Sequence, residues 1–366
     1  MKKLLLLLCL FLSLAFYSCT KNNPVNSDNS NNPSGITLNS NAKILSDGES
    51  AKIISITDSS ITFSPVDDTL NSLKTGDVII TGISENVPGG LLRKILSVSN
   101  GISSSSKVVS TQNASLEDLI KSGTIYFSSQ VLSVDQSINQ ILYDIDNDPA
   151  TQNDQVSLAG TVNEKGTVSG NLNIGSSRSV TGQFNFNLVG KADLILTGDI
   201  NANLNVFQYF IRAPFQPIVL SSNPPIVITP VVSLYVVLQG NAQGKFSTSV
   251  SNSFNSSVGI SLGNTLQVQP GLGDTFTFKG ASINFSSDMN FKLITSVSFL
   301  INNIPGPSLS FAPYMQLNSN LNQTPQWILY VGDNGKATNY AAWFSSSVPI
   351  QTWTFSSNQN ELSQGQ

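Results

Sequence analysis

The chain has 366 residues, of which only 11% are charged, and its formal net charge is −4. It contains no histidine, and both of its cysteines, Cys9 and Cys19, lie near the start of the sequence. The rest of the chain therefore cannot form a Ser-His-Asp triad, a Cys-His dyad, a histidine-ligated zinc site or a thiolate cluster. The charge balance also lacks the excess of Lys and Arg that nucleic acids or anionic membranes attract.

The first residues form the three zones of a secretory signal peptide. Lys2-Lys3 gives a positive start, and residues 4–15 are almost entirely apolar. This run is shorter than the roughly 20 residues of a membrane-spanning helix. Ser18-Cys19 resembles the end of the lipobox of bacterial lipoproteins, in which a small residue precedes the cysteine that receives diacylglycerol. Phe16 departs from that pattern, because such boxes usually carry leucine three residues before the cysteine.

The resemblance implies an exported lipoprotein that loses residues 1–18 and is anchored to a membrane through lipid on Cys19. The alternative is ordinary cleavage after Ala15, which ends a small-x-small triplet. Asn, Ser and Pro dominate the following residues, which offer too little apolar surface to offset the entropy of ordering. We therefore expect residues 19–35 to be the lipidated cysteine and a flexible tether. Thr20 stands where Asp would favour the inner membrane, so the outer membrane is favoured if the host has one.

Residues 36–142 are predicted to form a small β domain, a barrel or sandwich with one short helix. A Val-Pro-Gly-Gly turn at 87–90 separates two expected strands, because proline presets φ and glycine accepts a positive φ. The helix is expected near 114–122, with Asn113 or Ser115 as its cap and acidic residues in its first turn. Further strands are expected at 51–64, 107–111 and 124–133.

Residues 143–355 are predicted to form a larger all-β domain, an antiparallel β-sandwich or a closed β structure. Long alternation of apolar and polar residues, as over 184–206, indicates strands with one buried face. Turns are expected at 164–166, 263–264 and 333–335. The hydrophobic stretch 218–238 contains prolines, which favour two buried strands around a turn over a transmembrane helix. The polar tail, 356–366, is expected to be disordered.

The densest group of carboxylates lies between the two predicted domains. Its spacing resembles the start of the D-x-[DN]-x-[DN]-G calcium loop. Pro149 stands where that loop needs glycine, and Gln155 where it needs a bidentate glutamate, so an EF-hand is excluded. A looser calcium site and a solvated acidic linker remain the two interpretations of Asp144, Asp146, Asp148 and Asp154.

Carboxylate chemistry is the enzymatic option that remains. A glycosidase needs two carboxyl groups about 5–10 Å apart in one cleft. Asp193 and Asp199 share a strand face but lie roughly 20 Å apart along it. The glutamates Glu117, Glu164 and Glu361 are assigned to a helix start, a turn and the tail. We therefore expect no enzymatic activity.

Aromatic residues gather in the last part of the chain. Exposed rings there would stack on sugars, which makes Trp327, Tyr330, Tyr340 and Trp343 candidate ligand-binding residues. The alternative is that Trp327 and Trp353 close the core of the last strands. Their exposure decides between the two interpretations.

Two functions are compatible with these observations. The first is a binding or scaffold module, including an adhesive one, that uses sheet faces or loops as its contact surface. The second is a carrier of lipid or another hydrophobic ligand, held in an apolar cavity of the second domain. The membrane, through Cys19, is an expected partner in both cases, and nucleic acid is not.

Overall fold

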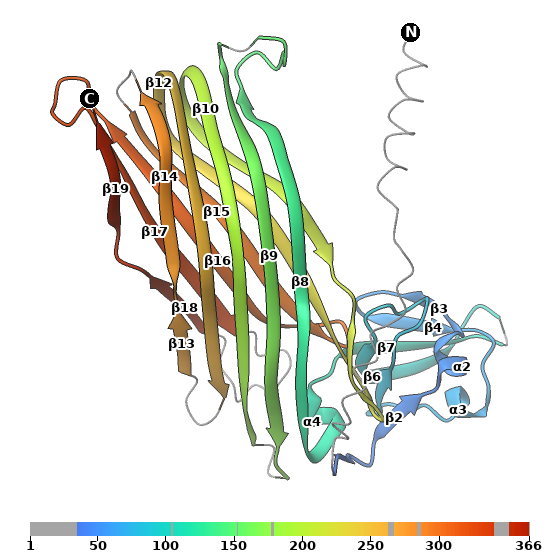
Figure 1. Cartoon of the computed structure of the whole chain (residues 1–366). Coiled ribbons are helices and arrows are strands. Elements are labelled where there is room, and N and C mark those ends of the chain that lie inside the picture. Colours follow the sequence, from blue (N-terminus) through green and yellow to red (C-terminus); the bar gives the residue numbers. More distant parts are fainter. Residues whose placement is uncertain are drawn as a thin grey trace, which may run out of the picture. The chain divides into compact units, whose positions relative to one another are not determined.

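The computed structural model describes residues 35–103, 105–151, 153–176, 179–262, 267–283, 287–339 and 351–365. The predicted signal peptide, Cys19 and the predicted turn at 263–264 lie outside these ranges, as do Tyr340 and Trp343. Strands dominate the described ranges (Figure 1), so the all-β prediction is confirmed. Within these ranges, no helix has the length and apolar character needed to cross a membrane.

The smaller of two sheets is six-stranded, in the order β2-β5-β6-β7-β4-β3. β2 and β5 are parallel and the other neighbours are antiparallel. The predicted turn at 87–90 joins β5 to β6, and Gly90 has a φ of +71°, which glycine adopts without strain. The bounds are β2 Ala42–Leu45, β3 Ile53–Ile56, β4 Ser60–Phe63, β5 Val78–Thr81, β6 Leu91–Asn100 and β7 Lys107–Asn113.

Side-chain caps begin the short helices α2 (Asp47–Ser50), α3 (Asp68–Asn71) and α4 (Leu116–Leu119). In each, the cap side chain accepts a hydrogen bond from the backbone N–H three residues later. For α4 the cap is Ser115, one of the two predicted caps. The helix is shorter than predicted, because Ile120 already has extended backbone and begins the next strand.

The larger sheet is 13-stranded and antiparallel, and its main path runs β1-β8-β9-β10-β12-β15-β16-β17-β18. β12 is paired along one side with β10, while its other side is shared by β15, β14 and β13 in succession. The bounds are β1 Thr37–Leu38, β8 Ile120–Asp144, β9 Gln155–Ile174, β10 Val180–Pro214, β11 Ile218–Ser222, β12 Pro225–Leu262, β13 Gln267–Gly271, β14 Asp274–Ile283, β15 Ser287–Ile301, β16 Ile304–Ser319, β17 Trp327–Asn339, β18 Gln351–Ser356 and β19 Asn360–Gly365.

This sheet curls so that strands distant in its order face each other across the core. Phe186 on β10 stacks on Phe311 of β16, with ring centroids 6.0 Å apart. Thr295 Oγ1 on β15 donates to the carboxyl oxygens of Glu164 on β9, each at 2.8 Å. The inward side chains alternate strictly with outward ones along β15, as a strand with one buried face requires.

Glycines in these strands lie beneath aromatic rings of the neighbouring strand. Gly198 is directly opposite Phe246, and a Cβ atom on Gly198 would come within 2.3 Å of that ring. Glycine leaves a strand without side-chain packing at its position, and a ring laid across the backbone restores that packing. The same directly opposed pairing recurs at Gly190 with Phe254, Gly335 with Phe355, Phe127 with Gly170 and Trp327 with Gly365.

Several sequence predictions are corrected by these strands. The predicted turns at 164–166 and 333–335 lie inside β9 and β17, where Glu164 and Asp333 are inward-facing residues less than 4% exposed. The predicted disordered tail contains β19, which pairs with β17. The interpretation of 218–238 as two strands around a proline turn is confirmed, by β11 and the start of β12.

The predicted division into two domains at residue 142 is not confirmed. β8 runs through that position from Ile120, and β1 near the start of the described chain already belongs to the larger sheet. The core of the larger sheet also includes Val78, Ile80 and Leu92 from the smaller one. Residues 31–366 accordingly form a single compact unit.

Candidate functional site

The acidic loop after β8 brings together three of the four predicted calcium ligands. Carboxyl oxygens of Asp144, Asp146 and Asp154 lie within 4.8 Å of one another. Asp148 is not part of the group, and its Oδ1 accepts a hydrogen bond from the backbone N–H of Ala150 at 3.0 Å. Oxygen ligands at this spacing suit a hard cation.

Bonds within the loop already use many of these oxygens. Asp144 Oδ1 accepts from the backbone N–H of Asn147, and its Oδ2 accepts from Gln155 Nε2. Desolvation and the neighbouring Asp146 raise the pKa of Asp144, while the backbone N–H of Asp148 lowers the pKa of Asp146. A solvated acidic loop has the same bonds, so calcium binding stays a prediction.

Trp327 and Tyr330, the two described residues of the predicted aromatic site, do not lie on one face of the strand. Trp327 is only 7% exposed and packs in the core, with its ring centroid 5.9 Å from that of Phe278. Tyr330 has the opposite parity on β17 and lies on the outward face. Trp353 packs partly buried against the core, as the alternative interpretation requires.

Asp193 and Asp199, the carboxylates predicted to share a strand face, both have lysines as neighbours. Lys191 Nζ lies 2.7 Å from Asp193 Oδ2, and Lys279 Nζ lies 2.5 Å from Oδ1. Hydrogen bonds from these two lysines hold the pKa of Asp193 well below its usual range. Asp199 is directly opposite Lys245 in the β10–β12 ladder.

Sequence reasoning missed a group of buried carboxyls. Burial raises the pKa of Glu164 to about 7, partly opposed by the hydrogen bond from Thr295. Burial and the adjacent Asp274 side chain raise the pKa of Asp333 to about 8. Asp333 is only 1% exposed, whereas Asp274 is half-buried. A raised pKa in the folded state makes the stability of the protein depend on pH.

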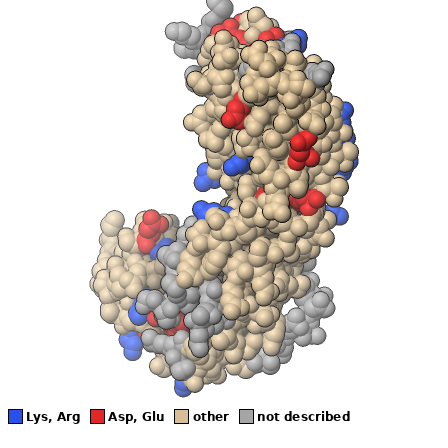
Figure 2. Space-filling view, turned by 90° about the vertical axis from the view of Figure 1, so that its left-hand side faces the viewer, with Lys and Arg blue, Asp and Glu red and all other residues tan. Residues whose placement is uncertain are grey.

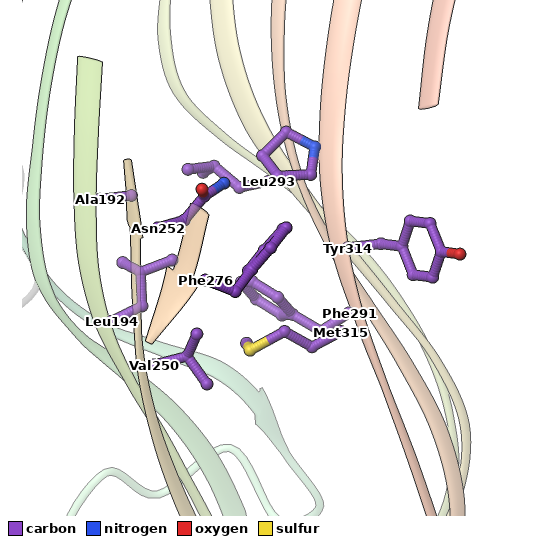
Figure 3. A pocket seen from close by; sticks show the side chains of 10 residues that line it. Ala192, Leu194, Val250, Asn252, Phe276, Phe291, Leu293, Tyr314 and Met315 are labelled. Carbon is purple, nitrogen blue, oxygen red and sulfur yellow. The ribbon is translucent and has the colours of Figure 1, made fainter. Parts of the chain in front are cut away.

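One pocket between the strands of the larger sheet offers little space for a ligand (Figure 3). A pocket lined by Leu194, Phe276, Phe291 and Met315 has a volume of only about 20 Å³. These side chains converge from several strands, whereas Tyr314 points away from them. One water molecule needs about 10–15 Å³ by such a measure, so this part of the core is filled by the protein's own side chains.

Three aromatic residues contact one another on the outward face of β10 and β12, and we call them the aromatic cluster. The ring centroid of Phe207 lies 4.9 Å from that of Tyr209 and 4.9 Å from that of Tyr235. Tyr209 and Tyr235 are directly opposite each other, 5.2 Å apart. Phe207 is 54% exposed and Tyr209 is 37% exposed. The guanidinium of Arg212 lies 5.3 Å from the Tyr209 ring centroid.

Amide side chains continue this face in two cross-strand rows, which we call the amide rows. Along β10, outward asparagines at 201, 203 and 205 lead directly to the aromatic cluster. Hydrogen bonds between Gln239 Nε2 and Asn205 Oδ1 (3.2 Å), and between Asn241 Nδ2 and Asn203 Oδ1 (2.9 Å), link β10 to β12. Strand register places one row at Asn205, Gln239, Asn290 and Gln316, and the other at Asn203, Asn241, Asp288 and Asn318.

A hollow of about 490 Å³ adjoins the aromatic cluster, and we call it the lysine hollow. Tyr235 belongs to both. Small side chains, Ser310 and Ala312, lie between the larger ones that border the hollow. Its lining contains Lys292 and Lys336 but no carboxylate. A second hollow of about 650 Å³, which includes Asp199 and Lys245, lies further along β10 and β12, on the side of the amide rows opposite to the aromatic cluster.

Charge is sparse on the surface of this protein. Figure 2 shows one face on which blue and red residues are scattered among uncharged ones. Among the residues that the structure describes, the ion pairs involve Lys52, Lys94, Lys191 and Lys279, and neither lysine of the hollow.

The chain matches no protein-family model. Searches among curated proteins and among solved structures likewise find no match.

Proposed function

We propose that this protein is an exported lipoprotein, anchored through Cys19, whose folded part is a non-enzymatic binding module. Binding occurs at the outward face of the larger sheet, through the aromatic cluster. The observation that carries this proposal is a group of three mutually contacting rings, in which Phe207 (54%) and Tyr209 (37%) are exposed and Tyr235 is half-buried. Contiguous exposed aromatic surface is costly in water and is typical of interaction sites.

The surroundings of the cluster support a contact surface for a partner outside the cell. Exposed amides flank it in place of Lys and Glu, so a partner can be bound without removing many charges from water. The anchor is supported by the signal-like first residues and by Ser18-Cys19. A tether after the anchor would let this face reach material beyond the membrane.

The alternative function, a carrier of hydrophobic ligands, is less well supported. Pockets for small ligands are usually about 300–1,000 Å³ and largely apolar. The interior pocket beside Phe276 has about 20 Å³. The larger hollows are open to solvent, and their linings mix lysine, serine and asparagine with apolar residues.

Co-sedimentation with insoluble cell-envelope material tests this function. The full chain with Cys19→Ala should be used, because a lipid anchor would itself cause sedimentation with membranes. We expect this protein to sediment with the envelope, and Tyr235→Ala to reduce the bound fraction at least about fivefold, as loss of a stacked ring implies.

Tyr126→Ala is the matched control, since Tyr126 is a 52% exposed tyrosine on β8, away from the aromatic cluster. It should bind like the parent. Equal loss in both variants, or binding that neither affects, would contradict a role for the outward face. Lipid found in the protein by native mass spectrometry would favour the carrier instead.

A further inference from the structure

We infer that the outward face binds an acidic polysaccharide, one that carries carboxylate or sulfate groups. This inference rests on the proposed function and names its ligand class. The aromatic cluster stacks on sugar rings, the amide rows bond to hydroxyls, and the lysine hollow takes the anionic groups.

The aromatic cluster supplies the apolar part of the contact. A sugar ring has an apolar face of C–H groups and an equator of hydroxyls, so it stacks on flat rings that stay partly exposed. Phe207 and Tyr209 lie on the same side of β10, and Tyr235 joins them from β12. The three rings are tilted by 41–83° with respect to one another. They therefore form an uneven platform and not a single flat plane.

The amide rows supply hydrogen bonds of the kind that hydroxyls need. Each Asn or Gln side chain offers two donors and one accepting oxygen, and the bonds between neighbours use only part of this capacity. Asn201, Asn203 and Asn205 present such groups at every second residue of β10. From Asp199 to Tyr209 this strand extends roughly 33 Å, at about 3.3 Å per residue. That length favours an extended polymer over a single sugar.

Charge complementarity selects an acidic polymer over a neutral one. The lysine hollow contains Lys292 and Lys336, no carboxylate lines it, and neither lysine is in an ion pair with a described residue. Arg212 adds a third cation beside the Tyr209 ring. The protein has a net charge of −4, whereas these three cations give the surroundings of the aromatic cluster a positive local charge. Asp333 directly precedes Asn334 of the hollow's lining but is buried. Asp288, in one amide row on the outward face, is four residues from Lys292 on the same strand, and Gln316 Nε2 lies 3.5 Å from its Oδ1.

Affinity electrophoresis of the full chain in native gels tests the inference. One gel contains polygalacturonate, a second contains dextran as a neutral polymer, and a third contains none. We expect strong retardation by polygalacturonate and weak retardation by dextran. Lys292→Ala with Lys336→Ala should weaken binding to polygalacturonate about tenfold at low salt and less at high salt, without changing the response to dextran.

Tyr235→Ala should weaken binding to both polymers, and Phe207→Ser should repeat the effect if the first variant folds poorly. Tyr126→Ala and Lys165→Ala, both exposed on the same sheet, should behave like the parent. Equal retardation by both polymers would overturn the preference for an acidic ligand. If neither polymer retards the protein, and if it still binds envelope material after periodate oxidation of the sugars, the ligand is not a polysaccharide. That result would overturn this inference but not the proposed binding function.

Discussion

Phe246→Ala should lower the free energy of unfolding by about 3–5 kcal/mol, as large-to-small substitutions of buried rings do. Phe246 is only 2% exposed and lies across the backbone of Gly198 on the neighbouring strand. Its loss leaves a cavity next to a residue that has no side chain to fill it. Urea unfolding at pH 6 measures the effect. The control is Phe207→Ala on the outward face, which should change stability by less than about 1 kcal/mol.

The partner glycine makes this prediction more specific. Gly198→Ala places a Cβ atom within 2.3 Å of the Phe246 ring and should cost about 1–3 kcal/mol through overpacking. In the Phe246→Ala background the same change has room, so its cost should disappear. Additive effects in the double variant would show that the two residues do not pack as described.

The free energy of unfolding should fall as pH rises from about 4 to about 8. The pKa of Glu164 is raised to about 7 and that of Asp333 to about 8, both mainly by burial. Unfolded carboxyls release their protons near pH 4, so between these values the folded state holds protons that the unfolded state has lost. Stability must then decrease with pH across this window. Glu164 alone accounts for about 3 kcal/mol of the decrease, at 1.36 kcal/mol per pKa unit.

Glu164→Gln tests this assignment. The amide keeps a polar partner for Thr295 but cannot ionise, so the variant should be about 2–3 kcal/mol more stable than the parent at pH 9. Near pH 4 the two should be similar. Glu361→Gln, at an exposed position on β19, is the control and should leave the pH profile unchanged. A parent protein whose stability is flat or rises between pH 5 and 9 would contradict the burial of these carboxyls.

The strands themselves were predictable because one face of each is apolar. Alternation over 184–206 indicated the buried face of β10, and the prolines between 224 and 230 indicated two strands where hydropathy alone suggested a helix. The same alternation also indicated which residues lie on the outward face. Phe207 and Tyr209 have the opposite parity to Leu204 and Val206, so their exposure followed from the pattern that gave the core.

Residue identity misled the prediction at two inward positions. Glu-Lys-Gly at 164–166 and Asp-Asn-Gly at 333–335 have the composition of turns, yet both lie within long strands. Glu164 and Asp333 have the same parity as the buried residues Val162 and Val331, which indicates that they face inward. The prediction assumed that carboxylates face water and therefore missed this. The glycines were also ambiguous, because Gly335 packs beneath Phe355, a residue 20 positions later that only the fold brings opposite it.

Cross-strand neighbours could not be predicted from the sequence. Tyr235 meets Tyr209 through a ladder whose register includes an irregularity between Tyr209 and Ile211, and Lys292 reaches this region from a third strand. A sequence pattern gives the face on which a residue lies but not its partner on the next strand. The acidic loop is different, because Asp144 and Asp146 are local in sequence and their proximity was predictable.

Hydroxyl-radical footprinting in the presence and absence of envelope material tests the central claim most directly. Oxidation of each aromatic side chain, read by mass spectrometry, reports its access to solvent in the same full chain with Cys19→Ala. If the outward face is the binding surface, Phe207, Tyr209 and Tyr235 should be protected several-fold by envelope material, and Tyr126 should be oxidised equally in both conditions. Unchanged oxidation of the aromatic cluster while the protein is bound, or protection confined to Tyr126, would contradict the account.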